Sequence, residues 1–188
     1  MRCEIINGRF EVDRMIEDIY GLPADGFSGY YIDYVDVCNL RGIGAFRQAL
    51  CCHFDSSDEN VFERVVAAVE SMHLPADKLR GAILHFVVAD CEGMSFDVLE
   101  LVSRLREWYV EMCRSVEIDP QVTFANCLAD IYADKTMSRG DCVIQFMFSF
   151  EKTEQERFED EAHIEAIRRY NDERRPIQTL TFESLGEE

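Results

Sequence analysis

Residues 58–90 read "DENVFERVVAAVESMHLPADKLRGAILHFVVAD" and join two different patterns of apolar residues. The first half repeats apolar side chains every three or four positions, which predicts a helix over 58–73 whose apolar face is made of Phe62, Val65, Val66, Val69 and Met72. Ser56 and Glu59 have the spacing of a capping box at its start. The second half is a continuous, partly β-branched run over 82–90, too short for an independent helix, and it predicts a buried strand.

The rest of the chain repeats these two patterns. Residues 94–114 again show helical spacing, and apolar segments at 44–54, 121–133 and 141–151 have the length and composition of strands. The last two segments are separated only by the polar stretch "DKTMSRG", which predicts that they form a hairpin. We therefore expect an α+β fold, in which a four-stranded mixed or antiparallel sheet packs against the two long helices.

Three regions follow from this organisation. Residues 1–29 are expected to hold the end of a helix and a loop, because apolar residues at helical spacing stop at Gly21. Residues 30–152 form the α+β domain, and residues 153–188 hold a highly charged helix and a tail. The charged helix carries a thin apolar stripe made of Phe158, Ala162 and Ile167. A stripe that narrow predicts that the helix docks on the domain or on a second copy of the chain.

The composition argues against two classes of partner. With 37 acidic and 19 basic residues the formal net charge is −18, and a surface of that sign repels nucleic acid. No stretch reaches the roughly 18 consecutive apolar residues that a membrane-spanning helix needs, and the first residues lack a secretory apolar run. We expect a cytoplasmic protein that binds neither nucleic acid nor membrane.

The eight cysteines are spread along the chain and mostly lie in apolar runs, which favours buried thiols of an intracellular protein over disulfide bonds. Metal binding is not expected, because Cys51, Cys52 and His53 are adjacent and alternate between the two faces of a strand. His85, inside the apolar run "AILHFVVA", is typical of a core histidine whose hydrogen bonds are satisfied.

Asp33 and Asp36, in "YYIDYVDVCNL" (residues 30–40), are the candidate functional residues. Their spacing fits the N-cap and N3 positions of a short helix that ends at Gly42. At these positions carboxylates accept hydrogen bonds from free backbone N–H groups and lie at the positive end of the helix. On this interpretation both residues are structural.

The order of elements and several residues resemble the C-terminal domain of the FtsZ/tubulin family of filament-forming GTPases. In "DRMIEDIYGLPADGFSGYYIDYVDVCNLRGIGAFRQAL", Asp33 and Asp36 match the acidic element that follows the central helix of bacterial FtsZ, with Tyr31 in place of the family's asparagine. Arg80 and Gly81 match the entry to a later strand, and "VTFANCLADIYADKTMSRGDCVIQFMFSF" resembles the terminal hairpin. The resemblance covers residues 10 to 150.

The resemblance implies a second interpretation of the two aspartates. In the family, the matching carboxylates enter the nucleotide pocket of the next subunit and orient the attacking water, so Asp33 and Asp36 could contribute to GTP hydrolysis in trans. The family's glycine-rich phosphate loop has no counterpart, because no cluster of glycines precedes a helix in this sequence. No nucleotide or other cofactor is expected, nor is autonomous GTPase activity.

The favoured hypothesis is a non-catalytic interaction module, either a stand-alone protein or a fragment, that resembles the C-terminal half of FtsZ/tubulin proteins. It would associate with itself or with a filament-forming GTPase of cell division or the cytoskeleton. One alternative is a trans-acting GTPase activator or filament cap that uses Asp33 and Asp36. The other is a small-molecule-binding or enzymatic domain on the same scaffold, since a fold does not fix a function.

Overall fold

The computed structural model describes residues 1–20, 32–89, 97–113, 123 and 125–174. The predicted loop at the end of region 1–29 and Tyr31 lie outside these ranges. In chain order the elements are β1 (Arg2–Asn7), α1 (Arg9–Tyr20), α2 (Tyr34–Ile43), β2 (Ala45–Asp55), α3 (Val61–Glu70), a 3₁₀ turn (Ala76–Lys78), β3 (Leu79–Val88), α4 (Val98–Cys113), β4 (Cys127–Ala133), β5 (Asp141–Phe150) and α6 (Glu154–Arg174).

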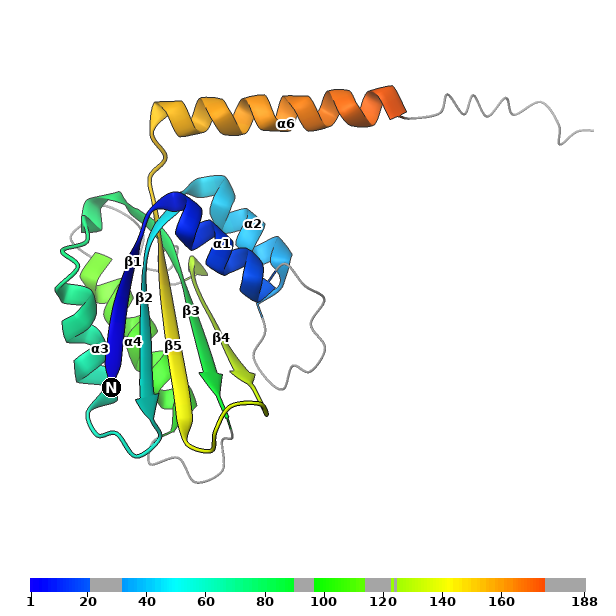
Figure 1. The fold of residues 1–188 in the computed structure, drawn as a ribbon. Coiled ribbons are helices and arrows are strands. Elements are labelled where there is room, and N and C mark those ends of the chain that lie inside the picture. Colours follow the sequence, from blue (N-terminus) through cyan, green and yellow to red (C-terminus); the bar gives the residue numbers. More distant parts are fainter. Residues whose placement is uncertain (21–31, 90–96, 114–122, 124, 175–188) are drawn as a thin grey trace, which may run out of the picture. The chain divides into compact units, whose positions relative to one another are not determined.

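The strands form one mixed sheet, which confirms the predicted α+β class, but the sheet has five strands and not four. Their order is β1-β2-β5-β3-β4 (Figure 1). The additional strand, β1, pairs antiparallel with β2 at the edge of the sheet. Its sequence "RCEIIN" is short and mixes charged with apolar residues, and most of its side chains are exposed. It therefore lacks the apolar run by which the other four strands can be recognised.

The predicted hairpin between the last two strands is wrong. β4 pairs in parallel with β3, whereas β5 lies between β2 and β3 and is antiparallel to both. Burial explains this order: β5 is buried along most of its length, and a strand covered on both faces belongs in the middle of a sheet. β4 is only partly buried and takes the edge. The connection "DKTMSRG" therefore passes the end of β3, where the Asp134 N–H donates to the Val88 carbonyl at 2.8 Å.

Two hydrophobic cores lie on opposite faces of the sheet (Figure 1). α3 and α4 cover one face, and that core includes the alternating residues Phe146, Phe148 and Phe150 of β5. α1 and α2 cover part of the other face, over Phe46, Ala49, Ile83 and Met147. The sheet thus carries a layer of helices on each side, and the start of α2 lies at the outside of one layer.

The two predicted long helices are present: α3 is shorter than the predicted range 58–73, and α4 begins at Val98. Ser56 and Glu59, which are predicted to cap α3, precede its N-cap residue. Instead, Asp55 ends β2 in a turn: its carboxylate accepts the N–H of Ser57 at 2.9 Å, and its own N–H donates to Asp58. α3 begins only after this turn, at the N-cap residue Asn60. Asn60 has a left-handed backbone, with φ of 58°, and makes no side-chain cap bond.

Cysteine pairing also differs from the prediction. Cys3 and Cys52 lie opposite each other on β1 and β2, with Cα atoms 4.1 Å apart, and form a disulfide bond. The sequence does not reveal this pair because β1 itself goes unrecognised. Cys113, Cys127 and Cys142 are buried free thiols, as predicted, and burial raises the pKa of Cys127 to about 12.

The chain divides into two units, Met1–Glu151 and Lys152–Glu188, and α6 belongs to the second. α6 begins with a capping box: Thr153 Oγ1 accepts the N–H of Glu156 at 3.2 Å, and the Glu156 carboxylate accepts the N–H of Thr153 at 2.7 Å. The side chains of Phe158 and Ala162 are exposed, and that of Ile167 lies outside the described set. The docking expected for this helix stays a prediction.

Candidate functional site

The two candidate aspartates lie at the start of α2. Asp33 is the N-cap residue: its Oδ1 accepts the backbone N–H of Asp36 at 2.9 Å, and Asp36 Oδ2 accepts the N–H of Asp33 at 3.4 Å. This reciprocal arrangement satisfies N–H groups that the first turn of a helix leaves free. The bonds use one oxygen of each carboxylate, and Asp33 is exposed. The pair can therefore cap the helix and still present negative charge to solvent.

Polar contacts around Glu17 hold α2 against α1. The Glu17 carboxylate accepts hydrogen bonds from Arg41 Nη1 at 2.6 Å and from the Tyr34 hydroxyl at 3.1 Å, and Arg41 also pairs with Asp13 at 3.2 Å. Loss of hydration, followed by the hydrogen bond to Glu17, raises the pKa of Tyr34. Tyr34 is therefore a neutral donor near neutral pH. The Tyr34 hydroxyl thus ties the first turn of α2 to α1, and the ion pairs of Arg41 tie its last turn.

Apolar side chains stand beside the capping aspartates. Val35 is 63% exposed and Tyr34 is 41% exposed, and the Cys38 thiol on the next turn is also exposed. Single exposed apolar residues are ordinary on a protein surface. Here, however, two adjacent ones lie in the first turn of a helix whose last turn is ion-paired to α1 through Arg41. We call Asp33, Tyr34, Val35 and Cys38 the α2 surface.

A second polar cluster is buried and joins α1, β3 and β4. Asp130 is fully buried; its Oδ1 lies 2.8 Å from His85 Nδ1 and accepts the Tyr20 hydroxyl at 3.1 Å. Tyr132 stacks on the His85 ring. His85 is thus a core histidine with hydrogen-bond partners, as predicted. Asp130 was not among the predicted residues, and its signal is the acidic residue inside the apolar strand "CLADIYA".

The His85–Asp130 contact resembles that of a proton-transfer pair, but a substrate could not reach the imidazole. An aspartate that binds one imidazole nitrogen can orient the other toward a substrate. His85 is only 5% exposed, so the imidazole is closed off by the surrounding side chains. The cluster instead links α1 to the neighbouring strands β3 and β4.

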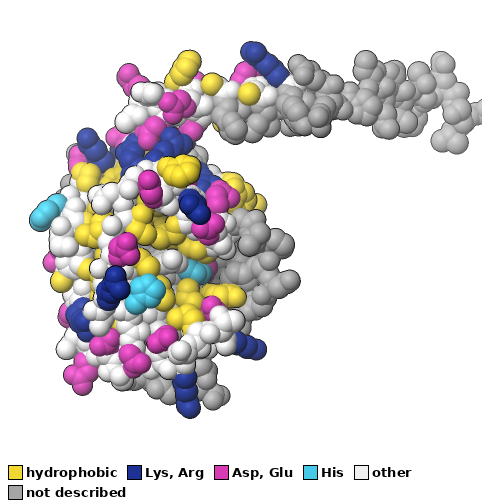
Figure 2. All heavy atoms as spheres, in the orientation of Figure 1, with side chains coloured by type: hydrophobic (Ala, Val, Ile, Leu, Met, Phe, Trp, Pro, Cys, Tyr) yellow, Lys and Arg dark blue, Asp and Glu magenta, His cyan; other side chains and the backbone are white. Residues whose placement is uncertain are grey.

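Strand pairing extends the cluster into a row of polar side chains across the sheet. The register aligns Glu4, Cys51, Gln145, His85 and Asp130 on the five strands. In Figure 1, α1 and α2 cover only one end of this face, and Figure 2 shows histidine and apolar side chains at the surface beyond them. Burial, and then the charge of Glu4, raise the pKa of Cys51. Its thiol is therefore neutral at physiological pH and a poor nucleophile.

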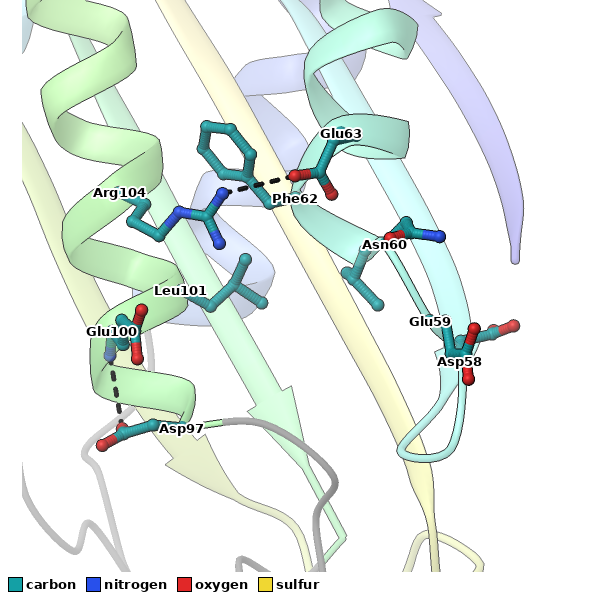
Figure 3. A pocket seen from close by; sticks show the side chains of 10 residues that line it. Asp58, Glu59, Asn60, Phe62, Glu63, Asp97, Glu100, Leu101 and Arg104 are labelled. Atoms are coloured by element: carbon teal, nitrogen blue, oxygen red, sulfur yellow. Dashed lines mark hydrogen bonds and ion pairs between the residues drawn. The ribbon is translucent and has the colours of Figure 1, made fainter.

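A groove of about 650 Å³ runs between the starts of α3 and α4 (Figure 3). Most of its lining is charged and comes from Asp58, Glu59, Glu63, Asp97, Glu100 and Arg104. Arg104 lies over the Phe62 ring at 4.0 Å and pairs with Glu63 at 3.3 Å, while Asp97 caps α4 through the N–H of Leu99. Small-molecule sites are mainly apolar with a few polar groups. The charged groove therefore does not favour a ligand or substrate site.

Within the described ranges, no three side chains of His, Cys, Asp or Glu come together in a way that could hold a metal ion. On β2, Cys51 Sγ lies 3.6 Å from His53 Nε2, whereas Cys52 belongs to the disulfide with Cys3. The helices in those same ranges include none that is long and apolar enough to cross a membrane.

No family model and no curated protein matches the chain. Among solved structures, the chain is similar to "CetZ2 from Haloferax volcanii - GTPgS bound protofilament", with 15% sequence identity and a TM-score of 0.39. The match covers 76% of this chain and 40% of the CetZ2 chain, so this chain spans less than half of that protein's length. The similarity is to a distant tubulin-like fold and carries no information about activity.

Proposed function

We propose that the chain is a non-catalytic interaction module that associates with itself or with a filament-forming GTPase, as its resemblance to the C-terminal half of FtsZ/tubulin proteins implies. The observation that supports this role best is the α2 surface. There, Val35 is 63% exposed and stands beside Tyr34, whose hydroxyl bonds to Glu17 of α1, on a helix whose Arg41 pairs with the same carboxylate.

A surface of this kind suits binding for two reasons. Because Tyr34 and Arg41 already share Glu17, little conformational freedom is lost when a partner orders them. Burying the exposed part of Val35 contributes about 1–2 kcal/mol, from the free energy of transferring an aliphatic side chain out of water. Tyrosine adds apolar area with a polar tip, the combination that protein interfaces favour.

The other polar features of the described chain support catalysis less well. The His85–Asp130 pair is enclosed, the Cys51 thiol has a raised pKa, and the groove between α3 and α4 is lined by charge. Each of these features has a structural explanation in the contacts described above. None of these features therefore argues for an enzymatic role over an interaction role.

Cosedimentation tests the proposal, with purified bacterial FtsZ polymerised by GTP as the probe. We expect the chain to enter the pellet with the polymers and Val35→Glu to weaken binding about tenfold or more, which is 1.4 kcal/mol. Leu99→Glu is the matched control, because Leu99 is 50% exposed on α4, away from α2. If Val35→Glu binds as Leu99→Glu does, the α2 surface is not the contact. If the wild type neither binds polymers nor self-associates, the proposed function is wrong.

A second candidate function, GTPase activation in trans, is favoured by the exposure of Asp33, whose carboxylate caps α2 through Oδ1. In this case Asp33→Asn preserves the cap but removes the charge that would orient water in a partner's pocket. Phosphate release by FtsZ polymers, measured with wild type and with Asp33→Asn, separates the candidates. Stimulation that is lost in the variant supports activation, whereas binding without stimulation supports the interaction module.

A further inference from the structure

The outer edge of β1 carries a defined set of backbone groups with no strand beside them in the described chain. Antiparallel pairs alternate between hydrogen-bonded and non-hydrogen-bonded positions. Across the β1–β2 pair, the Gly8 N–H donates to the Arg47 carbonyl at 2.9 Å, so Gly8 occupies a hydrogen-bonded position. Counting back by two, Ile6, Glu4 and Arg2 also direct their backbone groups toward β2.

The intervening residues Cys3, Ile5 and Asn7 therefore point their N–H and C=O groups outward. The Cys3–Cys52 geometry agrees, because its Cα separation of 4.1 Å is close to the roughly 4.5 Å of a non-hydrogen-bonded pair and shorter than the other kind. Six backbone groups, two on each of three residues, thus line the open edge.

We propose that this edge pairs with the β1 edge of a second copy of the chain, antiparallel across a two-fold axis at Ile5. The inference rests on the proposed role as an interaction module and names a partner for it, but it uses a different surface from α2. In the dimer the two five-stranded sheets would join into one continuous sheet.

The backbone groups select this register. With Ile5 opposite Ile5, Cys3 faces Asn7 of the second copy, and all six outward groups of each strand find a partner. A two-fold axis at Glu4 leaves Asn7 unpaired and sets two Glu4 carboxylates against each other, which is unfavourable. An axis at Cys3 also leaves Asn7 unpaired, and an axis at Ile6 leaves Cys3 unpaired. Of these registers, only the one centred on Ile5 gives every outward backbone N–H and C=O group a hydrogen-bond partner.

The side chains suit the same register. Ile5 is 42% exposed, and the two copies would pack against each other at the centre of the dimer, while Glu4 lies opposite Ile6 of the second copy. Natural edge strands are commonly protected by lysine, proline or a bulge. β1 has no lysine or proline, and its pairing with β2 runs unbroken from Arg2 to Asn7. The disulfide bond between Cys3 and Cys52 keeps β1 attached to β2, so the strand is already extended before a second copy binds.

Sedimentation velocity of the full chain, in buffer without reductant, tests the dimer. We expect a concentration-dependent dimer for the wild type and a dissociation constant at least about tenfold higher for Ile5→Lys, since two ammonium groups would then face each other at the axis. Leu99→Lys adds the same charge at another exposed site and is expected to dimerise as the wild type does. A wild type that stays monomeric at its highest soluble concentration, or an Ile5→Lys dimer of unchanged affinity, overturns the proposal.

A second variant tests the register. In a Cys38→Ser background, which removes an exposed thiol, Ile5→Cys is expected to give a disulfide-linked dimer under mild oxidation, whereas Leu99→Cys is not. Equal cross-linking of both variants would contradict the Ile5 register. The two surfaces are separable: Ile5→Lys should still bind FtsZ polymers, and Val35→Glu should still dimerise. Loss of the dimer alone therefore refutes this inference and leaves the proposed function standing.

Discussion

At the scale of single residues, the start of α2 rests on hydrogen bonds that tolerate loss of charge. Asp33→Asn keeps an oxygen that accepts the Asp36 N–H, so we expect almost no change in the free energy of unfolding. Asp33→Ala removes the acceptor and should cost about 1 kcal/mol. Urea unfolding of the two variants measures the difference. Equal destabilisation of both variants would mean that charge at the helix end, and not the cap bond, stabilises α2.

Asp130 is expected to be far more sensitive. Asp130→Ala leaves His85 and Tyr20 without their shared acceptor in a buried site, and breaking a buried pair in this way costs about 3 kcal/mol or more. Asp141→Ala, at an exposed position at the start of β5, should change stability by less than about 0.5 kcal/mol. Thermal unfolding of both variants checks this. A small effect at Asp130 would show that the cluster does not hold α1, β3 and β4 together.

Whether the role of such a residue could be predicted depends on how close in sequence its contact partners lie. The capping positions of Asp33 and Asp36 follow from a spacing of three, and a core role for His85 follows from its apolar neighbours. Asp130 could not be found in this way, because its partners lie 45 and 110 positions away in the chain. The exposure of Val35 likewise depends on how α2 packs against α1, which no local pattern contains.

At the scale of elements, the helices were predictable because their apolar repeats lie within a few turns. Strand order was not, since pairing brings distant segments together. The short connection between β4 and β5 favoured a hairpin, but burial of β5 on both faces placed it between β2 and β3. β1 was missed because an exposed edge strand needs no apolar run. α3 begins later than predicted, because the residues just after Asp55 form a turn with its carboxylate instead of the first turn of the helix.

α6 is stabilised at its start by local contacts, and we expect it to depend on them. Thr153→Ala removes the hydroxyl that accepts the Glu156 N–H and should weaken the helix start by about 1 kcal/mol. Faster hydrogen exchange of the Glu156 amide, measured by NMR in the full chain, would report this. Thr136→Ala, in the turn after β4, is the matched control and should leave α6 unchanged. An unaltered Glu156 amide would indicate that contacts elsewhere stabilise the helix.

At the scale of the whole molecule, the α+β class and the mixed sheet follow from the sequence, whereas the open edge of β1 does not. The net charge of −18 adds a condition to self-association, because two copies repel each other. Salt screens that repulsion, over about 10 Å at 0.1 M.

Self-association is therefore expected to tighten as sodium chloride is added, because the proposed contact consists of backbone bonds and Ile5, and not of ion pairs. Sedimentation velocity at low and high salt measures the change. Weakening of the dimer by salt would indicate an ionic interface somewhere else on the chain.

The bond between Cys3 and Cys52 closes a covalent ring, since the two cysteines are 49 positions apart. That ring contains α1, α2 and most of β1 and β2. A protease that cuts one peptide bond inside it releases nothing: the nicked chain should migrate as a single species in denaturing gels without reductant and as two fragments once the bond is reduced. In Cys3→Ser the same cut should separate the fragments at once. Samples judged intact by size alone could thus already be cleaved.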